Sequence, residues 1–195
     1  MSGALFFMAA SLDEQKRSLR GLVRARMPGA GSPEFVAASL AAQERLLSQV
    51  LATDARVIAL YRALGAECGT ASVATALEAA GREICYPVVV PAERALQFRR
   101  GAGIFAAGAL GVEEPTGSPV PLGEIELMVV PAQAVDASGR RLGRGRGHYD
   151  ATLAEYQGPT VALVLDSQLV PEVPVGEHDR RVGAVCTEAR WIAVP

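Results

Sequence analysis

Apolar residues recur at helical spacing over the first quarter of the chain, and two helices are predicted there. Residues 12–27 follow a capping box of the form Ser11-x-x-Glu14, a frequent start of a helix. The apolar face of this helix is expected to hold Leu19, Leu22 and Val23. A second helix is predicted after Ser32, because serine caps helices well and a proline suits the first helical position. Its apolar stripe is expected to consist of Val36, Leu40, Leu46, Leu47 and Val50.

From residue 56 the pattern changes to short apolar runs that alternate with helical segments. Helices are predicted over residues 70–80 and 147–156. Strands are predicted over residues 57–61, 84–90 (broken at Pro87), 127–130, 161–165, 184–187 and 191–194. Strand, helix and strand in this order form βαβ units, which imply parallel strands. Glycine and proline are frequent in residues 99–123, which are expected to run over the surface.

This alternation predicts an α/β fold with three layers, α/β/α, and a mostly parallel central sheet. The architecture is Rossmann-like and of the sugar isomerase/CoA-transferase type, with the early helices packed on it. The length of 195 residues suits one domain, assigned to residues 12–195. Residues 1–11 are interpreted as a loose N-terminal extension.

Composition narrows the possible classes of function. The chain has 19 basic and 21 acidic residues and a net charge of −2, which argues against a protein that coats nucleic acid or an anionic membrane. Its three cysteines form no CxxC pair and fit a reducing compartment, so a cytoplasmic location is expected. Eighteen of the 19 basic residues are arginine, and Lys16 is the one lysine. Lys16 and Arg20 lie four residues apart and share one helix face.

Residues 139–150 (GRRLGRGRGHYD) carry the strongest chemical signal, because glycines alternate with arginines just before a predicted helix. Such glycines let backbone amides surround an anion, and a helix N-terminus adds positive potential. Arg140, Arg141, Arg144 and Arg146 add forked donors that suit phosphate oxygens. Phosphate binding is therefore favoured over the alternative of an exposed Arg-Gly loop that touches RNA.

Three carboxylates are candidates for a site around that segment. Asp150 and Asp179 offer the oxygen ligands that Mg²⁺ prefers, although a helix-start residue and a loop ion pair are equally good interpretations. Glu67 follows a predicted strand, where the loops of an α/β sheet line the ligand crevice, and is a candidate acceptor for a heterocycle or a plain loop carboxylate. A zinc site from His148 and His178 has no supporting spacing.

Taken together, several segments resemble the 5-formyltetrahydrofolate cyclo-ligase family. The strongest are residues 130–136 (VPAQAVD) and 139–150, which are similar to the family's P-x-x-x-F-D and G-x-RLG-x-G-x-G-YYD signature. Residues 16–20 (KRSLR) resemble its K-x-x-L-R element. Further similarity is found at residues 60–70, 86–87, 108–115, 173–179 and 187–188.

The resemblance implies an ATP- and Mg²⁺-dependent ligase that closes 5-formyltetrahydrofolate to 5,10-methenyltetrahydrofolate, with ADP and phosphate as the other products. The implied catalytic residues are Lys16, Arg144 and Arg146. The implied ATP-binding residues are Lys16, Arg20, Arg141, Leu142, Gly143, Arg144, Gly145, Arg146, Gly147, His148 and Tyr149. The implied folate-binding residues are Arg62, Glu67, Arg144, Gly145, Arg146, Gly147 and His148. The implied Mg²⁺ ligands are Asp150 and Asp179.

Three positions depart from the family pattern. His148 replaces the first tyrosine of YYD, Val135 replaces the phenylalanine before Asp136, and Arg146 stands where lysine is frequent. The rival interpretations are a sugar-phosphate or CoA-thioester enzyme on the same scaffold, and a non-catalytic RNA-binding module. The expected partners are small molecules, namely ATP and a reduced folate, with no nucleic acid or membrane, and the chain is expected to be a monomer or a weak homo-oligomer.

Overall fold

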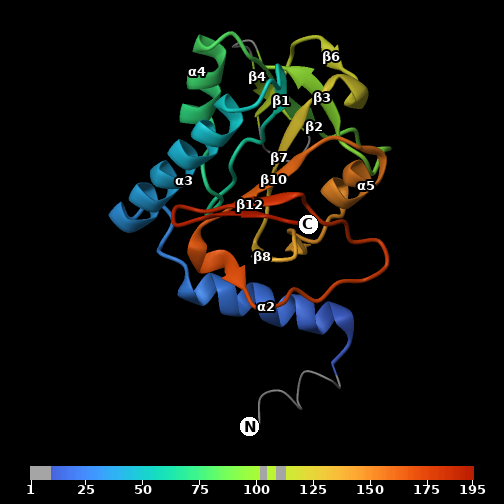
Figure 1. Cartoon of the computed structure of the whole chain (residues 1–195). Coiled ribbons are helices and arrows are strands. Elements are labelled where there is room, and N and C mark those ends of the chain that lie inside the picture. Colours follow the sequence, from blue (N-terminus) through green and yellow to red (C-terminus); the bar gives the residue numbers. More distant parts are fainter. Residues whose placement is uncertain (1–9, 102–104, 109–112) are drawn as a thin grey trace.

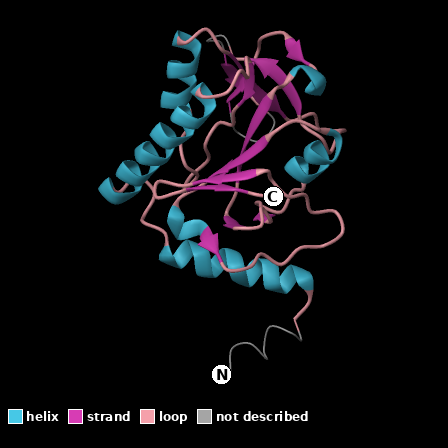
Figure 2. Cartoon of the chain, in the orientation of Figure 1, coloured by secondary structure: helices cyan, strands magenta, loops and turns pink. Residues whose placement is uncertain are grey.

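The computed structural model describes residues 10–101, 105–108 and 113–195, and its centre is an eight-stranded sheet (Figures 1 and 2). The strand order is β13-β12-β10-β7-β1-β2-β3-β6. These strands are, in chain order, β1 (Val57–Ala59), β2 (Glu83–Val88), β3 (Gln97–Arg100), β6 (Pro119–Val120), β7 (Leu127–Pro131), β10 (Thr160–Leu163), β12 (Ala184–Cys186) and β13 (Trp191–Ala193). The helices are α2 (Leu12–Arg26), α3 (Pro33–Leu51), α4 (Ala71–Ala79) and α5 (His148–Glu155).

The five central strands are parallel, and the strands at both edges are antiparallel. β1 pairs in parallel with β2 and β7, and β10 pairs in parallel with β7 and β12. β13, β3 and β6 each pair antiparallel with their neighbours. The predicted mostly parallel sheet is therefore confirmed.

Helices cover both faces of the sheet, as the predicted three-layer α/β/α architecture requires. Figure 1 shows α3 and α4 on one face and α5 on the other. Alternate residues of each strand separate the two cores: Ile58 packs on the side of α3 and α4, whereas its neighbour Ala59 packs on the side of α5. Strands that are buried on both faces explain the continuous apolar runs in the sequence.

The strand order reverses between β1 and β7. From β1 the chain crosses through α4 to β2 on one side, and from β7 it crosses through α5 to β10 on the other. Since both crossovers have the usual right-handed sense, the two helices lie on opposite faces and leave a crevice at the carboxyl ends of these two strands.

Two smaller sheets complete the fold. β8 (Ala134–Asp136) pairs with β9 (Arg141–Leu142) and β11 (Leu169–Val170), and β4 (Phe105–Ala107) pairs with β5 (Glu113–Pro115). α2 packs on the β8–β9–β11 sheet through a small separate core, in which its Val23 lies among Ala134, Leu142, Val170 and Val173. This contact holds the N-terminal helix where its Lys16 and Arg20 line the crevice.

The expected helix starts at Ser11 and Ser32 are confirmed. Ser11 and Glu14 form the reciprocal capping box, and the Ser32 hydroxyl accepts a hydrogen bond from the amide of Phe35 at 3.2 Å. Most of the predicted N-terminal extension, residues 1–9, lies outside the described residues. No helix in the described part of the chain is long and apolar enough to cross a membrane.

Two predictions for the segment after β1 were wrong. Pro87 does not break its strand. The pairing of β1 with β2 ends at Ala59 and Cys85, so no β1 residue lies opposite Pro87, and the missing N–H of proline costs no hydrogen bond of the sheet. Residues 99–123 are not simply a surface loop, since β3 and β6 extend the main sheet and β4–β5 form a hairpin. Glycine and proline masked these strands, which are only two to four residues long. Residues 102–104 and 109–112 of this segment lie outside the described residues.

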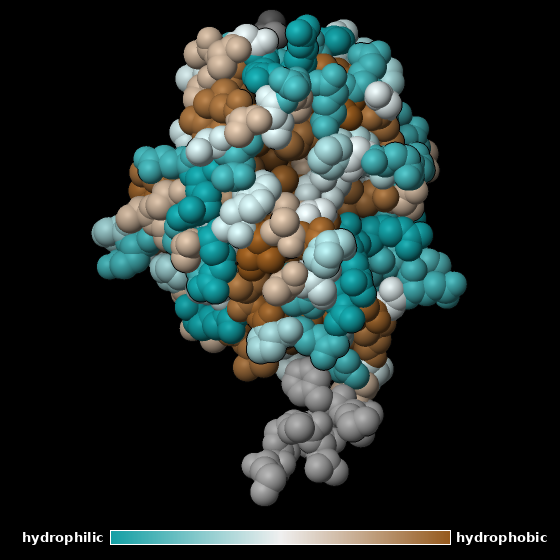
Figure 3. Space-filling model, viewed as in Figure 1, coloured by the Kyte–Doolittle hydropathy of each residue, from teal (hydrophilic) through white to brown (hydrophobic). Residues whose placement is uncertain are grey.

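Three predicted core positions are exposed instead. Leu22 is 59% exposed, and Val36 and Leu40 are 46% and 47% exposed. In α3 the buried face turns Phe35, Ser39, Ala42 and Gln43 inward, because Ser39 and Gln43 bond to α4 and its preceding loop. Figure 3 shows that exposed apolar side chains lie among hydrophilic ones on the face that it draws.

The three cysteines are free and buried, as expected for thiols without a reactive setting. Burial raises the pKa of the Cys68 thiol to about 11, and it raises those of Cys85 and Cys186 to about 12. None of the three is activated as a nucleophile.

Asp136 organises the β8–β9 turn. Its Oδ1 accepts hydrogen bonds from the amide and hydroxyl of Ser138 at 2.9 and 2.7 Å and from the amide of Arg140 at 3.1 Å. Its Oδ2 accepts from the amide of Val173 at 2.9 Å. With 1% exposure, the carboxylate has exchanged water for these donors.

We therefore expect Asp136→Ala to lower the free energy of unfolding by about 3 kcal/mol, because it leaves several buried donors unpaired. Urea denaturation measures the change. Ser138→Ala is the control and should cost about 1 kcal/mol, since it removes one hydroxyl and keeps the carboxylate. Equal, small effects of both substitutions would contradict this role of Asp136.

Candidate functional site

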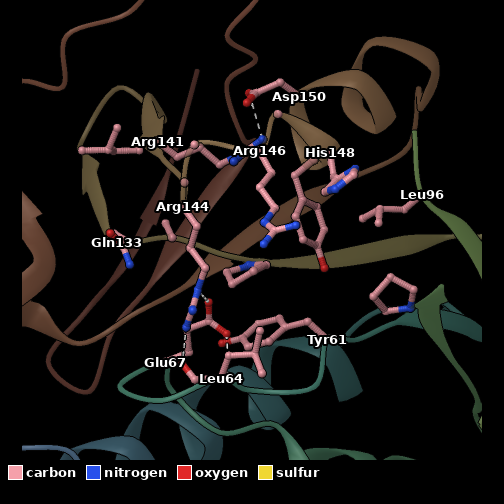
Figure 4. Close-up of a pocket in the computed structure, with 18 of the residues that line it drawn as sticks. Tyr61, Leu64, Glu67, Leu96, Gln133, Arg141, Arg144, Arg146, His148 and Asp150 are labelled. Carbon is pink, nitrogen blue, oxygen red and sulfur yellow. Dashed lines mark hydrogen bonds and ion pairs between the residues drawn. The ribbon is translucent and has the colours of Figure 1, made fainter. Parts of the chain in front are cut away.

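A cavity of about 410 Å³ lies at the reversal of the strand order. Its walls come from the carboxyl ends of β1, β2 and β7, from α2, and from the segment that connects β9 to α5 (Figure 4). The rule for open α/β sheets places ligands at this point of the fold. The cavity has an apolar wall of Pro87, Val89 and Leu96 and a wall rich in cations.

α2 supplies two of these cations from one face, as the four-residue spacing predicted. The ammonium of Lys16 donates to Oδ2 of Asp179 at 2.5 Å, and Nε of Arg20 donates to the carbonyl of Gly143 at 3.0 Å. Burial on its own would raise the pKa of Asp179, but the bonds from Lys16 and the Gly176 amide outweigh it and hold that pKa below its usual value. The ion pair ties α2 to the loop after β11.

The Arg-Gly loop (residues 143–147) has the backbone expected of an anion-binding turn. Gly145 and Gly147 have φ angles of +96° and +75°, which L side chains rarely adopt. Gly147 is the cap residue of α5, and no side chain caps this helix. The first backbone amides of α5 therefore lie at the edge of the cavity. No side chain among the described residues accepts a hydrogen bond from them, so they are free to bind an anionic ligand.

Arg141 lies at the base of this loop, almost entirely buried. One guanidinium nitrogen donates to Oδ1 of Asp150 at 2.9 Å, and the group lies 5.8 Å from the centre of the Tyr149 ring. Its Nε is buried and has no partner among the described residues. Burial lowers the pKa of Arg141, and the nearby Asp150 carboxylate counteracts this only in part. A further anion at this place would stabilise the charge.

Arg144 crosses the cavity to the loop that follows β1. Its Nε donates to Oε1 of Glu67 at 2.7 Å, and a second nitrogen donates to the carbonyl of Leu64. The other oxygen of Glu67 accepts from the amide of Leu64 at 2.8 Å. Figure 4 shows these three residues together on the opposite side of the cavity from Asp150.

Arg62 lines the cavity, and its side chain is 38% exposed. It donates to Glu113 at 2.6 Å, and its guanidinium lies 4.3 Å from the centre of the Phe105 ring. Both partners belong to the β4–β5 hairpin, so this contact fixes the hairpin against the loop after β1.

The structure brings the predicted site residues together in one cavity. All the residues predicted to bind ATP, folate or Mg²⁺ line it: Lys16, Arg20, Arg62, Glu67, Arg141, Leu142, Gly143, Arg144, Gly145, Arg146, Gly147, His148, Tyr149, Asp150 and Asp179. Arg140 is the exception among the arginines considered for phosphate binding. Its guanidinium turns away to Glu172 at 2.7 Å and to Asp136, so that interpretation was wrong for Arg140.

The histidines do not form a metal site. His148 contacts the carbonyl of Arg94 at 2.9 Å, and His178 lies exposed in a loop. Within the described ranges, no group of three or more His, Cys, Asp or Glu side chains is placed to hold a metal ion. A metal at Asp150 and Asp179 would therefore need further ligands from a substrate.

Sequence reasoning missed several lining residues, of which Tyr61, Leu96 and Gln133 are the most informative. Tyr61 and Gln133 each lie two residues after the end of a strand, β1 and β7 respectively, and the rule that ligands bind at the carboxyl ends of strands would have identified them. Leu96 has no such signal, because it reaches the cavity through the irregular connection between β2 and β3.

Comparison with known proteins gives a consistent result. Residues 12–188 match the model of the 5-formyltetrahydrofolate cyclo-ligase family. A Mycolicibacterium smegmatis protein named 5-formyltetrahydrofolate cyclo-ligase is 34% identical over 154 residues, which cover 73% of this chain and 78% of that protein. A mouse protein of the same name is 26% identical and covers 92% of this chain and 97% of its own length. The solved structure of Aquifex aeolicus 5,10-methenyltetrahydrofolate synthetase shares the fold, with a TM-score of 0.79 at 22% identity over 94% of this chain and 92% of that one.

The Arg141–Asp150 pair is asymmetric, and stability measurements should reveal it. The Arg141 side chain is 2% exposed, whereas that of Asp150 is 21% exposed. Asp150→Ala leaves a buried unpaired cation, and we expect a loss of about 3 kcal/mol in the free energy of unfolding. Arg141→Met leaves a carboxylate that water still reaches, and about 1 kcal/mol is expected. Urea denaturation of both variants tests this, and a larger loss for Arg141→Met would contradict it.

Proposed function

Because the chain belongs to the 5-formyltetrahydrofolate cyclo-ligase family, a family of ligases, we propose that it closes 5-formyltetrahydrofolate to 5,10-methenyltetrahydrofolate at the expense of ATP. One observation supports this most directly. A single cavity combines a basic, glycine-lined wall with an apolar wall, so that phosphates and a heterocycle fit side by side.

The reaction needs ATP because the formyl oxygen is a poor leaving group. The formyl oxygen attacks the γ-phosphorus of ATP, the bond to the bridging oxygen breaks, and ADP leaves. The neighbouring folate nitrogen then adds to the formyl carbon and loses its proton, and the carbon–oxygen bond breaks as phosphate departs. Each step moves charge onto phosphate oxygens, so that positioning and charge neutralisation account for most of the catalysis.

The cations of the basic wall have distinct roles in this proposal. Lys16 and Arg20 hold phosphate oxygens from the α2 side, and Arg141 does so from the base of the Arg-Gly loop. Arg144 and Arg146 lie on the exposed part of the loop and neutralise the transferring phosphoryl group. The amides from Gly143 to Tyr149 complete the phosphate site.

Asp150 and Asp179 fit Mg²⁺ by the chemistry of their donors. Each uses one carboxylate oxygen for a cation and a backbone amide, and the described residues provide no hydrogen-bond partner for the other oxygen. One or two carboxylates together with substrate phosphates are the usual ligands of this ion in proteins. When bound, Mg²⁺ neutralises phosphate charge.

The folate lies along the apolar wall in this proposal. Glu67 accepts hydrogen bonds from the amino and ring nitrogens of the heterocycle, and Arg62 contacts the substrate from the same loop. His148 replaces a tyrosine of the family signature, and its ring lies between this wall and the phosphate site (Figure 4).

The rival functions make different demands. A sugar-phosphate or CoA-thioester enzyme would use the basic wall, but neither activity is that of the family to which the chain belongs. A non-catalytic RNA-binding module is set aside, because the family consists of enzymes and Arg141 and Arg144 face the cavity in ion pairs. The remaining proposals are ATP and a reduced folate as the small-molecule partners and a monomer or weak homo-oligomer as the assembly.

We expect the purified protein to form 5,10-methenyltetrahydrofolate when it is given ATP, Mg²⁺ and 5-formyltetrahydrofolate. The product absorbs in the near ultraviolet, so a spectrophotometer follows the reaction directly. Omission of ATP or chelation of Mg²⁺ should abolish the signal. No ATP-dependent absorbance from folded protein would refute the proposed activity.

Lys16→Arg tests whether the one lysine of the chain is needed as a compact ammonium. The larger guanidinium cannot take the same place between Asp179 and a phosphate, so we expect kcat to fall about 10-fold or more. Arg17→Lys, an exposed change one residue away on α2, is the control. Wild-type kinetics for Lys16→Arg would show that the reaction does not require a lysine at position 16.

A further inference from the structure

Of the four ion pairs between described residues of the cavity, only that of Arg144 and Glu67 joins two residues that the proposed function assigns to different ligands. In the pairs Lys16–Asp179 and Arg141–Asp150, both residues are assigned to the phosphates of ATP or to Mg²⁺. Arg144 and Glu67, by contrast, come from the Arg-Gly loop and from the loop after β1, which lie on opposite sides of the cavity (Figure 4).

The contact leaves little of Glu67 for a substrate. The Arg144 guanidinium occupies Oε1, the Leu64 amide occupies Oε2, and the side chain of Glu67 is 9% exposed. Because so little of this carboxylate is exposed, a heterocycle that donates to it competes with the guanidinium for the same place. A phosphate that takes Nε and the adjacent terminal nitrogen of Arg144 in a bidentate contact must likewise displace Glu67 and the carbonyl of Leu64.

The first ligand to bind must break this ion pair, and the free energy that this requires weakens its binding. A nucleotide that captures Arg144 leaves a buried carboxylate without a counter-ion, which is unfavourable. A folate that captures Glu67 separates Arg144, which is 45% exposed, from both its acceptors. When both ligands are present, Arg144 and Glu67 each gain a new partner. The ion pair is broken only once, so the second ligand binds without that loss of free energy.

We propose that the Arg144–Glu67 ion pair couples the two substrate sites, so that nucleotide and folate each increase the affinity for the other. This inference rests on the proposed function. Coupling of this kind is reciprocal, since the factor by which nucleotide improves folate binding equals the factor by which folate improves nucleotide binding. The enzyme thereby favours the ternary complex over either binary complex.

The experiment measures this factor with 5-formyltetrahydrofolate and the non-hydrolysable nucleotide β,γ-methylene-ATP in the presence of Mg²⁺. Isothermal titration gives the dissociation constant of each ligand alone and in the presence of a saturating amount of the other. For the wild-type chain we expect both ratios to agree and to be about fivefold or more.

Arg144→Gln and Glu67→Gln both remove the ion pair, and each should reduce the factor to about one. The double variant should show no further reduction, because the contact is already broken in each single variant. Arg146→Gln is the matched control: it removes a cation from the same loop that has no ion pair among the described residues, so nucleotide binding weakens while the factor persists.

A wild-type factor of one, or a factor that survives in both Arg144→Gln and Glu67→Gln, overturns the coupling. These results differ from failure of the proposed function itself, in which the wild-type chain binds neither ligand and produces no methenyl-folate absorbance.

Discussion

The reversal of strand order between β1 and β7 is the constraint on which the rest of the molecule depends. Right-handed crossovers from these two adjacent strands send α4 to one face and α5 to the other, so neither helix covers the carboxyl ends of the strands. The chain then closes this gap with polar elements. The Arg-Gly loop enters from the α5 side, the loop after β1 enters from the α4 side, and α2 contacts the Arg-Gly loop through Arg20. The cationic side chains of the Arg-Gly loop and the Glu67 carboxylate therefore face one another because of the topology.

Charge balance explains how so many cations can share one cavity before a ligand arrives. Lys16, Arg62, Arg141 and Arg144 each pair with a carboxylate, and most of these pairs join segments far apart in the sequence. Each pair also keeps a side chain in a defined place, which reduces the entropy lost when substrate binds. The net charge of −2 for the whole chain conceals this local arrangement. Substrate binding on this account exchanges internal ion pairs for contacts with phosphates and a heterocycle.

The sequence predicted the parallel core, because β1, β7 and β10 are continuous apolar runs and Ser11 and Ser32 are clear helix caps. It also identified the glycine-rich segment before α5, in which Gly145 and Gly147 have positive φ. It did not predict the edge strands β3 and β6, since strands so short are held by pairing with their neighbours, β3 with β2 and β6 with β3, rather than by local propensity. It also did not reveal the partners of Arg140 and Arg144, because these contacts span 32 and 77 residues and follow from tertiary structure alone.

The central claim is that the Arg-Gly loop and the first turn of α5 hold the phosphates of ATP. Hydrogen exchange of backbone amides, with and without β,γ-methylene-ATP and Mg²⁺, tests it most directly. The account predicts that the nucleotide slows exchange in residues 143–149, while the surface hollow lined by Thr53, Asp54 and Ala55 stays unchanged. Unaltered exchange in residues 143–149 at a saturating concentration of nucleotide would contradict it.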